Sequence, residues 1–409
     1  MEEWKTIRLG DACKSNSSTY STKENWDFVK YLDTGNITEN TIDSIQYIDL
    51  SSETLPSRAK RKVKYNSIIY STVRPNQRHF GIIKSQPENF LVSTGFSVID
   101  VSPEILDADY TYYLLTQSAI VESLHAIAEQ STSAYPSIKS SDIEDLEITI
   151  PPLDTQRRIA NALRCLDLKV ANNNKINQNL IEQVGSLFEQ QFGRFLGEDI
   201  IPDGWRVTEI SALDVLVTDY VANGSFKSLA DNVEYLDSET DNVLIRLTDY
   251  NSNFNSDMVY ISDSAYEFLS KSKLFGDEII ISNVGANVGT VFRCPRLSKR
   301  MSLGPNAIMI RSQLYEHYLF QLFTSRYGQH LLQSIVTGSA QPKFNKTNFR
   351  SLKVLIPDRD TLESFNDAYS PINEMIVQNN LQNRSLSSLR DSLLPKLMSG
   401  ELDVTEIEL

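Results

Sequence analysis

Residues 151–192, PPLDTQRRIANALRCLDLKVANNNKINQNLIEQVGSLFEQQF, have the pattern of one long amphipathic helix. A divergent copy, PDRDTLESFNDAYSPINEMIVQNNLQNRSLSSLRDSLLPKLMSGEL, occupies residues 357–402. The two stretches are offset by 206 positions, from Pro151 to Pro357. A chain that alternates domain, long helix, domain, long helix is the organisation that this duplication predicts.

Within each copy, apolar residues recur at alternating steps of four and three, which predicts a coiled-coil seam. Both helices place a pair of asparagines at matching seam positions, where a polar residue costs stability but fixes the register. We therefore expect Asn173 and Asn177 to meet Asn379 and Asn383 across an antiparallel contact, although ordinary core helices remain an alternative. The expected seam positions are Ile159, Leu163, Leu166, Val170, Asn173, Asn177, Leu180, Val184, Leu187 and Gln191, with Phe365, Tyr369, Ile372, Ile376, Asn379, Asn383, Leu386, Arg390, Leu393 and Leu397 in the copy.

The helix ends give further expectations. Asp154 and Asp360 are residue types that cap helix starts, and Asp360 with Glu363 fits a capping box. Pro371 lies inside the second copy, so we expect that helix to break or kink there, and Leu394-Pro395 to interrupt its end. A seam of this length would form a rod of roughly 50 Å.

The remaining sequence also repeats. Short strands are expected at residues 4–9, 28–32, 67–73 and 90–101, a helix at 109–128, and their counterparts in the second half include a strand at 278–284 and a helix at 315–332. We expect four parts: domains at residues 1–150 and 197–356, and long helices at 151–196 and 357–409. The fold class is mixed α/β (α+β), with two globular domains in pseudo-two-fold tandem repeat, separated by an antiparallel pair of long coiled-coil helices.

Composition limits the function. The formal net charge of −14 argues at first against a nucleic-acid binder. Cys13, Cys165 and Cys294 form neither a disulfide framework nor a metal cluster, and no long apolar run is present, so we expect a cytoplasmic protein without membrane contact. The sequence has no phosphate-binding loop, HExxH motif or methyltransferase [ND]PP[YF] motif. We therefore expect no catalytic residue and no metal site.

The charge distribution is uneven, so DNA binding remains a hypothesis despite the negative net charge. Residues 57–87 carry eight basic residues and no acid, and residues 279–315 and 331–357 also lack acids, whereas residues 198–278 hold 17 acids and 5 bases. Basic surfaces bind phosphate backbones through counterion release, and Arg, Asn and Gln read base edges. The candidate DNA-binding residues are Arg58, Lys60, Arg61, Lys62, Lys64, Arg74, Asn76, Gln77, Arg78, His79, Tyr135 and Lys139 in the first half, and Asn283, Asn287, Arg293, Arg296, Lys299, Arg300, Gln341, Lys343, Asn345 and Lys346 in the second.

The chain resembles the specificity (S) subunits of type I restriction-modification systems. The resemblance rests on SIIYSTVRP (67–75) with EIIISNVGANVGTV (278–291), on STSAYPSIKSSDI (131–143) with GSAQPKFNKTNF (338–349), and most of all on residues 151–192. It implies two target-recognition domains, each reading half of a split double-stranded DNA target, with the helix rod setting the gap. It also implies two methyltransferase (M) subunits that use S-adenosylmethionine, restriction (R) subunits, and no cofactor or catalytic residue in this chain.

Other functions remain open on the sequence alone. The chain could be a nuclease or methyltransferase with an unrecognised site, or a protein-interaction scaffold without a DNA role, which the net charge favours. Its partners could also belong to a type II or orphan methylation system.

Overall fold

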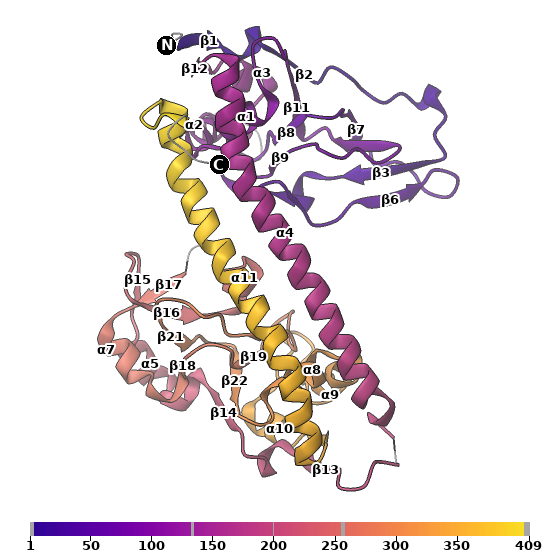
Figure 1. Cartoon of the computed structure of the whole chain (residues 1–409), viewed down its shortest axis with the longest axis vertical. Coiled ribbons are helices and arrows are strands. Elements are labelled where there is room, and N and C mark those ends of the chain that lie inside the picture. The colour runs from indigo at the N-terminus through magenta and orange to yellow at the C-terminus, as the bar shows by residue number, and fades with distance from the viewer. Residues whose placement is uncertain (1–3, 132–134, 199, 255–257, 405–409) are drawn as a thin grey trace. The chain divides into compact units, whose positions relative to one another are not determined.

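The computed structural model describes residues 4–131, 135–198, 200–254 and 258–404 (Figure 1). By its internal contacts the chain divides into two compact units. Unit 1 comprises residues 1–170 and 386–409, and unit 2 comprises residues 171–385. Each unit therefore contains one mixed α/β domain together with a segment of each long helix.

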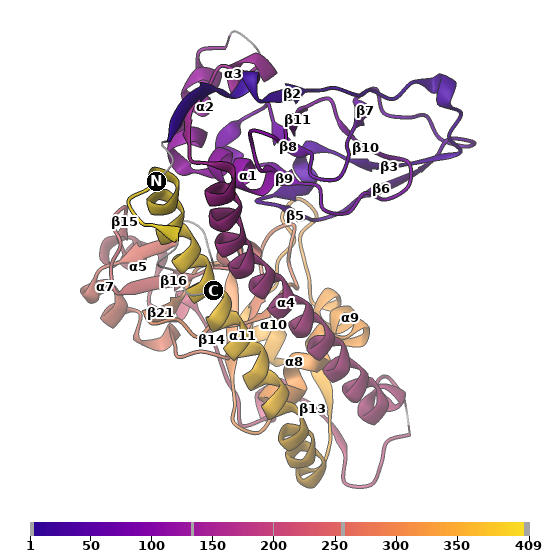
Figure 2. The ribbon, with the colours of Figure 1, turned by 45° about the horizontal axis from the view of Figure 1, so that its top comes forward.

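Unit 1 is built on two four-stranded sheets. The first is antiparallel, in the order β2 (Cys13–Ser15), β11 (Phe96–Val101), β8 (Ile68–Ser71), β9 (Phe80–Ile82). The second has a parallel central pair, β3 with β10, in the order β6 (Gln46–Asp49), β3 (Phe28–Leu32), β10 (Phe90–Ser93), β7 (Ala59–Lys62). Smaller elements complete it: β1 (Lys5–Arg8) paired with β12 (Glu147–Ile150), β4 (Ile37–Thr38) paired with β5 (Thr41–Ile42), and helices α1 (Ala108–Thr116), α2 (Ser118–Glu129) and α3 (Ser140–Glu144) (Figure 2).

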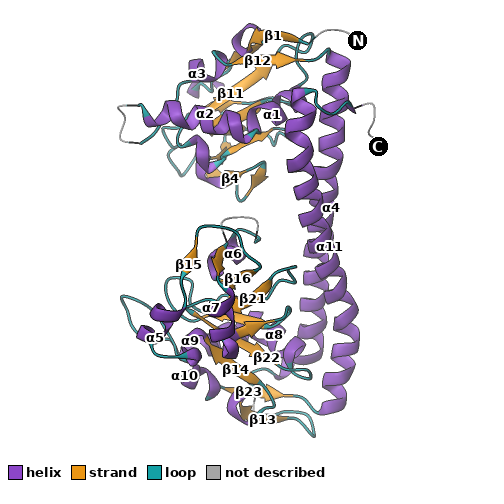
Figure 3. Ribbon diagram, turned by 90° about the vertical axis from the view of Figure 1, so that its left-hand side faces the viewer, coloured by secondary structure: helices purple, strands orange, loops and turns teal. Residues whose placement is uncertain are grey.

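Unit 2 repeats the strand order of both sheets and adds one strand, β15, at an edge of the second sheet (Figure 3). Its antiparallel sheet has the order β14 (Leu216–Asp219), β22 (Ala307–Arg311), β19 (Ile279–Ser282), β20 (Val291–Arg293). Its second sheet again has a parallel pair, β16 with β21, in the order β15 (Tyr235–Leu236), β17 (Val259–Ile261), β16 (Asn242–Ile245), β21 (Arg300–Leu303), β18 (Lys273–Leu274). The other elements are β13 (Arg206–Glu209) paired with β23 (Lys353–Ile356), and helices α5 (Phe226–Asn232), α6 (Leu247–Asn251), α7 (Asp263–Phe268), α8 (Glu316–Thr324), α9 (Arg326–Ser334) and α10 (Lys346–Arg350).

Equivalent sequences form equivalent elements. The apolar runs at residues 67–73 and 278–284 become β8 and β19, and every residue of both strands is buried. A continuous apolar run is what a strand covered on both faces requires. The matching strand orders and the matching parallel pairs support the tandem repeat that the sequence predicts.

Two expected helices are each divided in two. The stretch 109–128 turns at Gln117, whose ψ of 136° is extended, and the stretch 315–332 turns at Ser325, whose ψ is 159°. The second turn is tight, because a Cβ at Gly328 would lie 1.8 Å from the Leu322 carbonyl oxygen. The turn lets the buried faces of both short helices reach one core, which a single straight helix could not do.

The two long helices are α4 (Leu153–Phe192) and α11 (Arg359–Ser399). None of the expected seam positions is exposed. The helix ends also belong to the domain cores: Ile159 and Leu163 pack with Leu397 in unit 1, and Phe188 packs with Phe365 in unit 2. The helices are therefore core elements at their ends and a mutual pair between them.

The expected break at Pro371 is wrong, and so is the expected interruption at Pro395. α11 is continuous through both residues, and both lie on its exposed side. A proline in a helix removes one backbone donor and crowds the preceding turn. Here buried residues near the prolines hold the helix: Phe365 and Tyr369 precede the first proline, and Leu397 and Met398 follow the second. Tertiary packing thus overrides the local preference.

The expected N-caps are also displaced. α11 begins at Arg359, and the Asp358 carboxylate, rather than that of Asp360, accepts the Thr361 N–H at 2.9 Å. Glu363 pairs with Arg359 instead of closing a capping box. In α4, Asp154 lies inside the first turn. The aspartates two residues into each helix still favour the helix start, because they face its positive end.

Candidate nucleic-acid interface

In unit 1 the two polar loops that the sequence singled out lie against each other. The Arg74 N–H donates to the Pro136 carbonyl at 2.9 Å, and the Ile138 N–H donates to the Thr72 carbonyl at 2.8 Å. We call residues 72–79 and 135–139 the first platform. The other loop residues in the expected motif, 132–134, lie outside the described residues. The pairing fixes a strand-end loop against a loop about 60 residues away in sequence, so it needs the tertiary fold.

Unit 2 has the same arrangement. The Gly285 N–H donates to the Pro342 carbonyl at 2.9 Å, and the Phe344 N–H donates to the Asn283 carbonyl at 3.0 Å. We call residues 283–290 and 337–346 the second platform. Residues at equivalent places in the repeat make the same two backbone hydrogen bonds. The two platforms are therefore copies of one structural motif.

On the first platform, Arg74, Asn76, Gln77, Tyr135 and Lys139 are exposed. Asn76 and Gln77 belong to a short 3-10 turn, Pro75–Gln77. The Arg74 guanidinium carbon lies 5.3 Å from the centroid of the Tyr135 ring. Exposed amides and a guanidinium on a braced loop are the groups that hydrogen-bond to base edges.

Two candidates on this platform have structural partners. Arg78 forms an ion pair with Glu39 at 3.1 Å and donates to the Ser118 hydroxyl at 2.9 Å. The His79 Nδ1 lies 2.6 Å from the Ile37 carbonyl oxygen. Both side chains therefore brace the loop from beneath.

On the second platform, Asn287, Gln341, Lys343 and Asn345 are exposed. Asn345 also caps α10, since its side chain accepts the Asn348 N–H at 2.8 Å. The other two candidates hold the platform together: Asn283 donates to the Phe344 carbonyl at 3.0 Å, and Lys346 pairs with Asp219 at 3.1 Å.

Three bases of the first basic run, Lys60, Arg61 and Lys62, lie on β7, at the edge of its sheet. Arg58 and Lys60 are exposed and have no carboxylate partner among the residues described here. Arg61 is half-buried, and burial lowers the pKa of its guanidinium. Lys62 pairs with Glu24, and Lys64 pairs with Asp100 at 3.4 Å.

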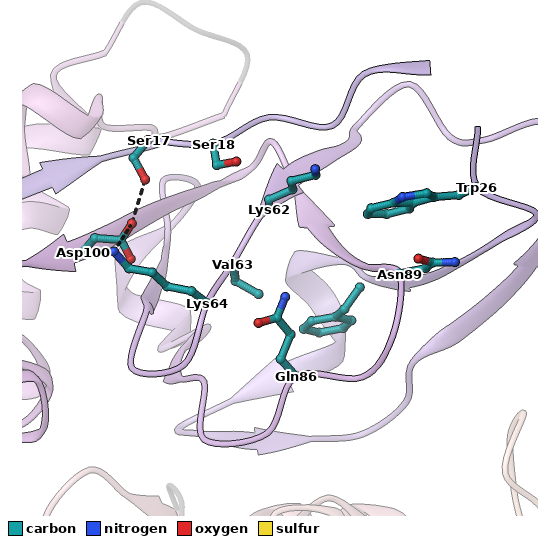
Figure 4. Close-up of a pocket in the computed structure, with 10 residues that line it drawn as sticks. Ser17, Ser18, Trp26, Lys62, Val63, Lys64, Gln86, Asn89 and Asp100 are labelled. Atoms are coloured by element: carbon teal, nitrogen blue, oxygen red, sulfur yellow. Dashed lines mark hydrogen bonds and ion pairs between the residues drawn. The ribbon is translucent and has the colours of Figure 1, made fainter. Parts of the chain in front are cut away.

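Beside this run is a shallow cleft of about 320 Å³ (Figure 4). Trp26, Lys62 and Lys64 line it, and the Lys62 ammonium lies 5.2 Å from the centroid of the Trp26 ring. Trp26 was not among the sequence candidates. It lies 36 positions before Lys62, so only the fold brings the aromatic ring to the basic strand.

The second basic run is mostly neutralised. Arg293 pairs with Glu316 at 3.1 Å, Arg296 with Asp277 and Glu374, Lys299 with Glu239 at 2.7 Å, and Arg300 with Asp263. The acid-free stretch of the sequence therefore does not become an equally positive surface. The part of these four residues in DNA binding stays a prediction.

The four seam asparagines lie together in unit 2. The Asn173 side chain donates to Asn383 and Gln382, both at 2.8 Å, and Asn379 donates to Asn177 at 2.8 Å. Asn177 also donates to Asn380 at 2.9 Å. Ascending numbers in α4 meet descending numbers in α11, so the pair is antiparallel here.

A second polar contact joins the helices in unit 1. The Arg390 guanidinium donates to the Asp167 carboxylate at 2.9 Å, and the Tyr113 hydroxyl donates to the other Asp167 oxygen at 2.6 Å. Burial and hydrogen bonding to Asp167 raise the pKa of Tyr113. Asp167 thus has a structural partner on α1 as well as on α11.

Across the described residues, no group of three or more His, Cys, Asp or Glu side chains is placed to hold a metal ion. A search of the same residues finds no helix long and apolar enough to cross a membrane. Burial raises the pKa of the Cys13 thiol to about 11, so it stays protonated at neutral pH.

The chain is similar to known DNA specificity subunits. Residues 1–182 match the family model for the type I restriction modification DNA specificity domain. The chain is 23% identical to the HindI specificity subunit of Haemophilus influenzae, over 98% of the chain and 100% of that relative. It is 24% identical to the MjaIX specificity subunit of Methanocaldococcus jannaschii, over 94% of the chain and 85% of that relative.

A solved structure shows the same fold. The S subunit of a type I restriction-modification system from M. genitalium superposes with a TM-score of 0.56 at 14% identity, covering 97% of this chain and 96% of that one. The sequence matches extend over nearly the whole chain, and the fold is shared: the chain is similar to the specificity subunits of type I restriction-modification systems, and its residues 1–182 match their DNA specificity domain.

Proposed function

We propose that each repeat of this chain reads one half of a bipartite double-stranded DNA target, and that the chain itself performs no catalysis. The observation that carries the proposal is the pair of platforms. Each joins two loops by the same two backbone hydrogen bonds, and each exposes amide and basic side chains. Two equivalent readers in one chain are suited to a target in two parts.

We assign two roles, one to exposed residues of the platforms and one to exposed residues of the β7 edge. The exposed residues Arg74, Asn76 and Gln77 contact bases in one half-site, and Asn287, Gln341 and Lys343 contact bases in the other. Arg58 and Lys60, at the sheet edge, contact phosphates. Phosphate contacts position a protein on the duplex, whereas base contacts give sequence preference.

We further propose that the chain works in the cytoplasm as part of a complex. Two methyltransferase subunits, which would supply S-adenosylmethionine, and restriction subunits for cleavage are the partners that fit a specificity subunit. The exposed faces of α4 and α11, which lie outside the seam, give these partners a helical surface to bind.

The test is to co-express the chain with its methyltransferase subunit and map the methylated sites in cellular DNA. We expect a motif of two short specified halves separated by unspecified base pairs. Alanine at both Asn76 and Gln77 should relax one half, and alanine at Gln341 and Lys343 should relax the other. A continuous motif, or a change in both halves from one pair of substitutions, would contradict the two-reader proposal.

A scaffold without DNA reading is the second candidate, because so many basic residues have carboxylate partners. Charge reversal at Arg58 and Lys60 separates the two. Both side chains are exposed, so the fold should tolerate Arg58→Glu with Lys60→Glu. Unchanged duplex affinity at moderate salt would favour the scaffold.

A further inference from the structure

Arg74 has an unusual backbone conformation. Its φ of 48° and ψ of 68° lie in the left-handed region, and it directly precedes Pro75. Residues with a side chain rarely occupy this region, and a following proline normally drives its neighbour to an extended conformation. The equivalent residue of the second platform is Gly285, which has a φ of 96° and carries no side chain to strain.

The hydrogen bond from the Arg74 N–H to Pro136 holds this conformation. Glycine would satisfy the same backbone geometry more easily, as Gly285 does with Pro342. Strained residues persist at functional sites because the surrounding structure holds them there. The arginine side chain therefore provides something that the backbone alone does not require.

The side chain of Arg74 is also oriented in advance. Its guanidinium lies over the Tyr135 ring, and within the described part of the chain it pairs with no carboxylate. Arg78, four residues later, instead pairs with Glu39. Stacking on an aromatic face restrains the planar guanidinium while leaving its N–H donors available.

A restrained guanidinium with unused donors matches guanine. The O6 and N7 acceptors of guanine in the major groove accept two parallel N–H donors, and no other base presents that pair. A phosphate also accepts hydrogen bonds from arginine. A phosphate contact, however, does not require the guanidinium to be held by an aromatic ring beside two amide side chains. The neighbours Asn76 and Gln77 are themselves base-reading types.

We propose that Arg74, stacked on Tyr135, reads one guanine in the half-site of the first domain. Gly285 gives the second domain no arginine at the equivalent place, so the two half-sites are read by different chemistry. This inference rests on the proposed two-reader function and adds the base, the residue and the asymmetry between the repeats.

The central variant is Arg74→Gly, which installs the residue of the equivalent position and relieves the backbone. Methylated sites are mapped for the complex of full-length chain and methyltransferase, with the wild type and with each variant. We expect one guanine of one half-site to become unspecified, with its preference falling from roughly 5- to 150-fold to near unity. The other half-site should not change.

Three further variants refine the assignment. Arg74→Lys keeps the charge but not the fork, so it should weaken the guanine preference. Tyr135→Phe keeps the ring and should preserve the preference, whereas Tyr135→Ala should reduce it. Lys14→Ala, an exposed lysine on β2 outside both platforms, is the matched control.

A binding measurement on modified DNA tests the contact in the wild-type complex itself. Duplexes carrying 7-deazaguanine at the assigned position lack the N7 acceptor. These duplexes should bind the wild-type complex more weakly than duplexes with guanine do. The complex with Arg74→Gly should bind both kinds of duplex equally. An equal loss of methylation at all sites with an unchanged motif would mean a phosphate contact and overturn the assignment. A wild-type motif without two halves would instead overturn the proposed function itself.

Discussion

The Asn173 side-chain amide donates to the Asn383 side-chain oxygen at 2.8 Å, and Asn173 is fully buried. This contact joins α4 to α11 at the positions where the repeat places matching asparagines. A buried amide needs a partner, and a shift of either helix along the other would remove it. The contact therefore ties the stability of the helix pair to one alignment.

Replacing Asn173 by alanine should destabilise unit 2. The change leaves the Asn383 and Gln382 oxygens without their donor, which costs about 1–3 kcal/mol when the groups are buried and somewhat less here, since Gln382 is exposed. Urea unfolding followed by circular dichroism measures the effect. Asn172→Ala, one position earlier and exposed, is the control and should change stability by less than about 0.5 kcal/mol. Equal effects of the two variants would mean that the asparagine contacts do not stabilise the pair.

The ion pair between Arg390 and Asp167 should show coupling in a double-mutant cycle. The side chains are 27% and 34% exposed, so solvent screens the pair and we expect a coupling of about 1–2 kcal/mol rather than the larger cost of breaking a fully buried pair. The cycle uses Arg390→Met, Asp167→Asn and both together, measured by chemical unfolding. Arg390→Met alone should also release Asp391, which the same guanidinium binds at 2.8 Å. Additive single effects would show that the pair is not coupled.

Unit 2 should lose stability as the pH rises from 5 to 8 because of Glu316. Burial raises the pKa of this carboxyl from 4.5 to about 7, despite the Arg293 guanidinium 3.1 Å away. Since Glu316 binds its proton more tightly in the folded chain, its contribution is complete below about pH 4.5 and is lost as the pH rises through about 7. Glu316→Gln should therefore gain about 1–3 kcal/mol relative to the wild type between pH 5 and pH 8.

His317 provides the opposite slope in the same site. Burial and the positive charge of Arg293 lower its pKa from 6.5 to about 4, so its contribution is present above pH 6.5 and is lost as the pH falls through about 4. His317→Gln should thus lose stability relative to the wild type as the pH rises from 4 to 7. Melting temperatures at matched pH and ionic strength test both variants, and parallel pH profiles for wild type and Glu316→Gln would contradict the first.

DNA affinity should depend on salt through the exposed bases of β7. If Arg58 and Lys60 each neutralise a phosphate, the double variant Arg58→Ala with Lys60→Ala should reduce the slope of log K against log salt by about 2. The loss of affinity should be the same for target and non-target duplexes. Lys14→Ala should leave the slope unchanged. A selective loss on the target duplex would mean that these residues read bases.

The sequence by itself determined the organisation. The offset of 206 positions predicts the repeat, the alternating four and three steps predict the helix pair, and the apolar runs predict the buried strands β8 and β19. Period and burial are properties of neighbouring residues, so they can be read without a fold. The same is true of the polar loops that follow the buried strands.

The tertiary structure alone decided which polar and basic side chains stay exposed and unpaired for DNA binding. Arg293 and Arg296 are as basic in sequence as Arg58, but carboxylates from distant segments neutralise them. Pro371 favours a break or kink, yet α11 is continuous through it, with Phe365 and Tyr369 buried just before it. Arg74 meets Tyr135 only because backbone bonds join two loops about 60 residues apart. Ion pairing and packing depend on contacts between residues far apart in the chain, and a local sequence pattern does not predict those contacts.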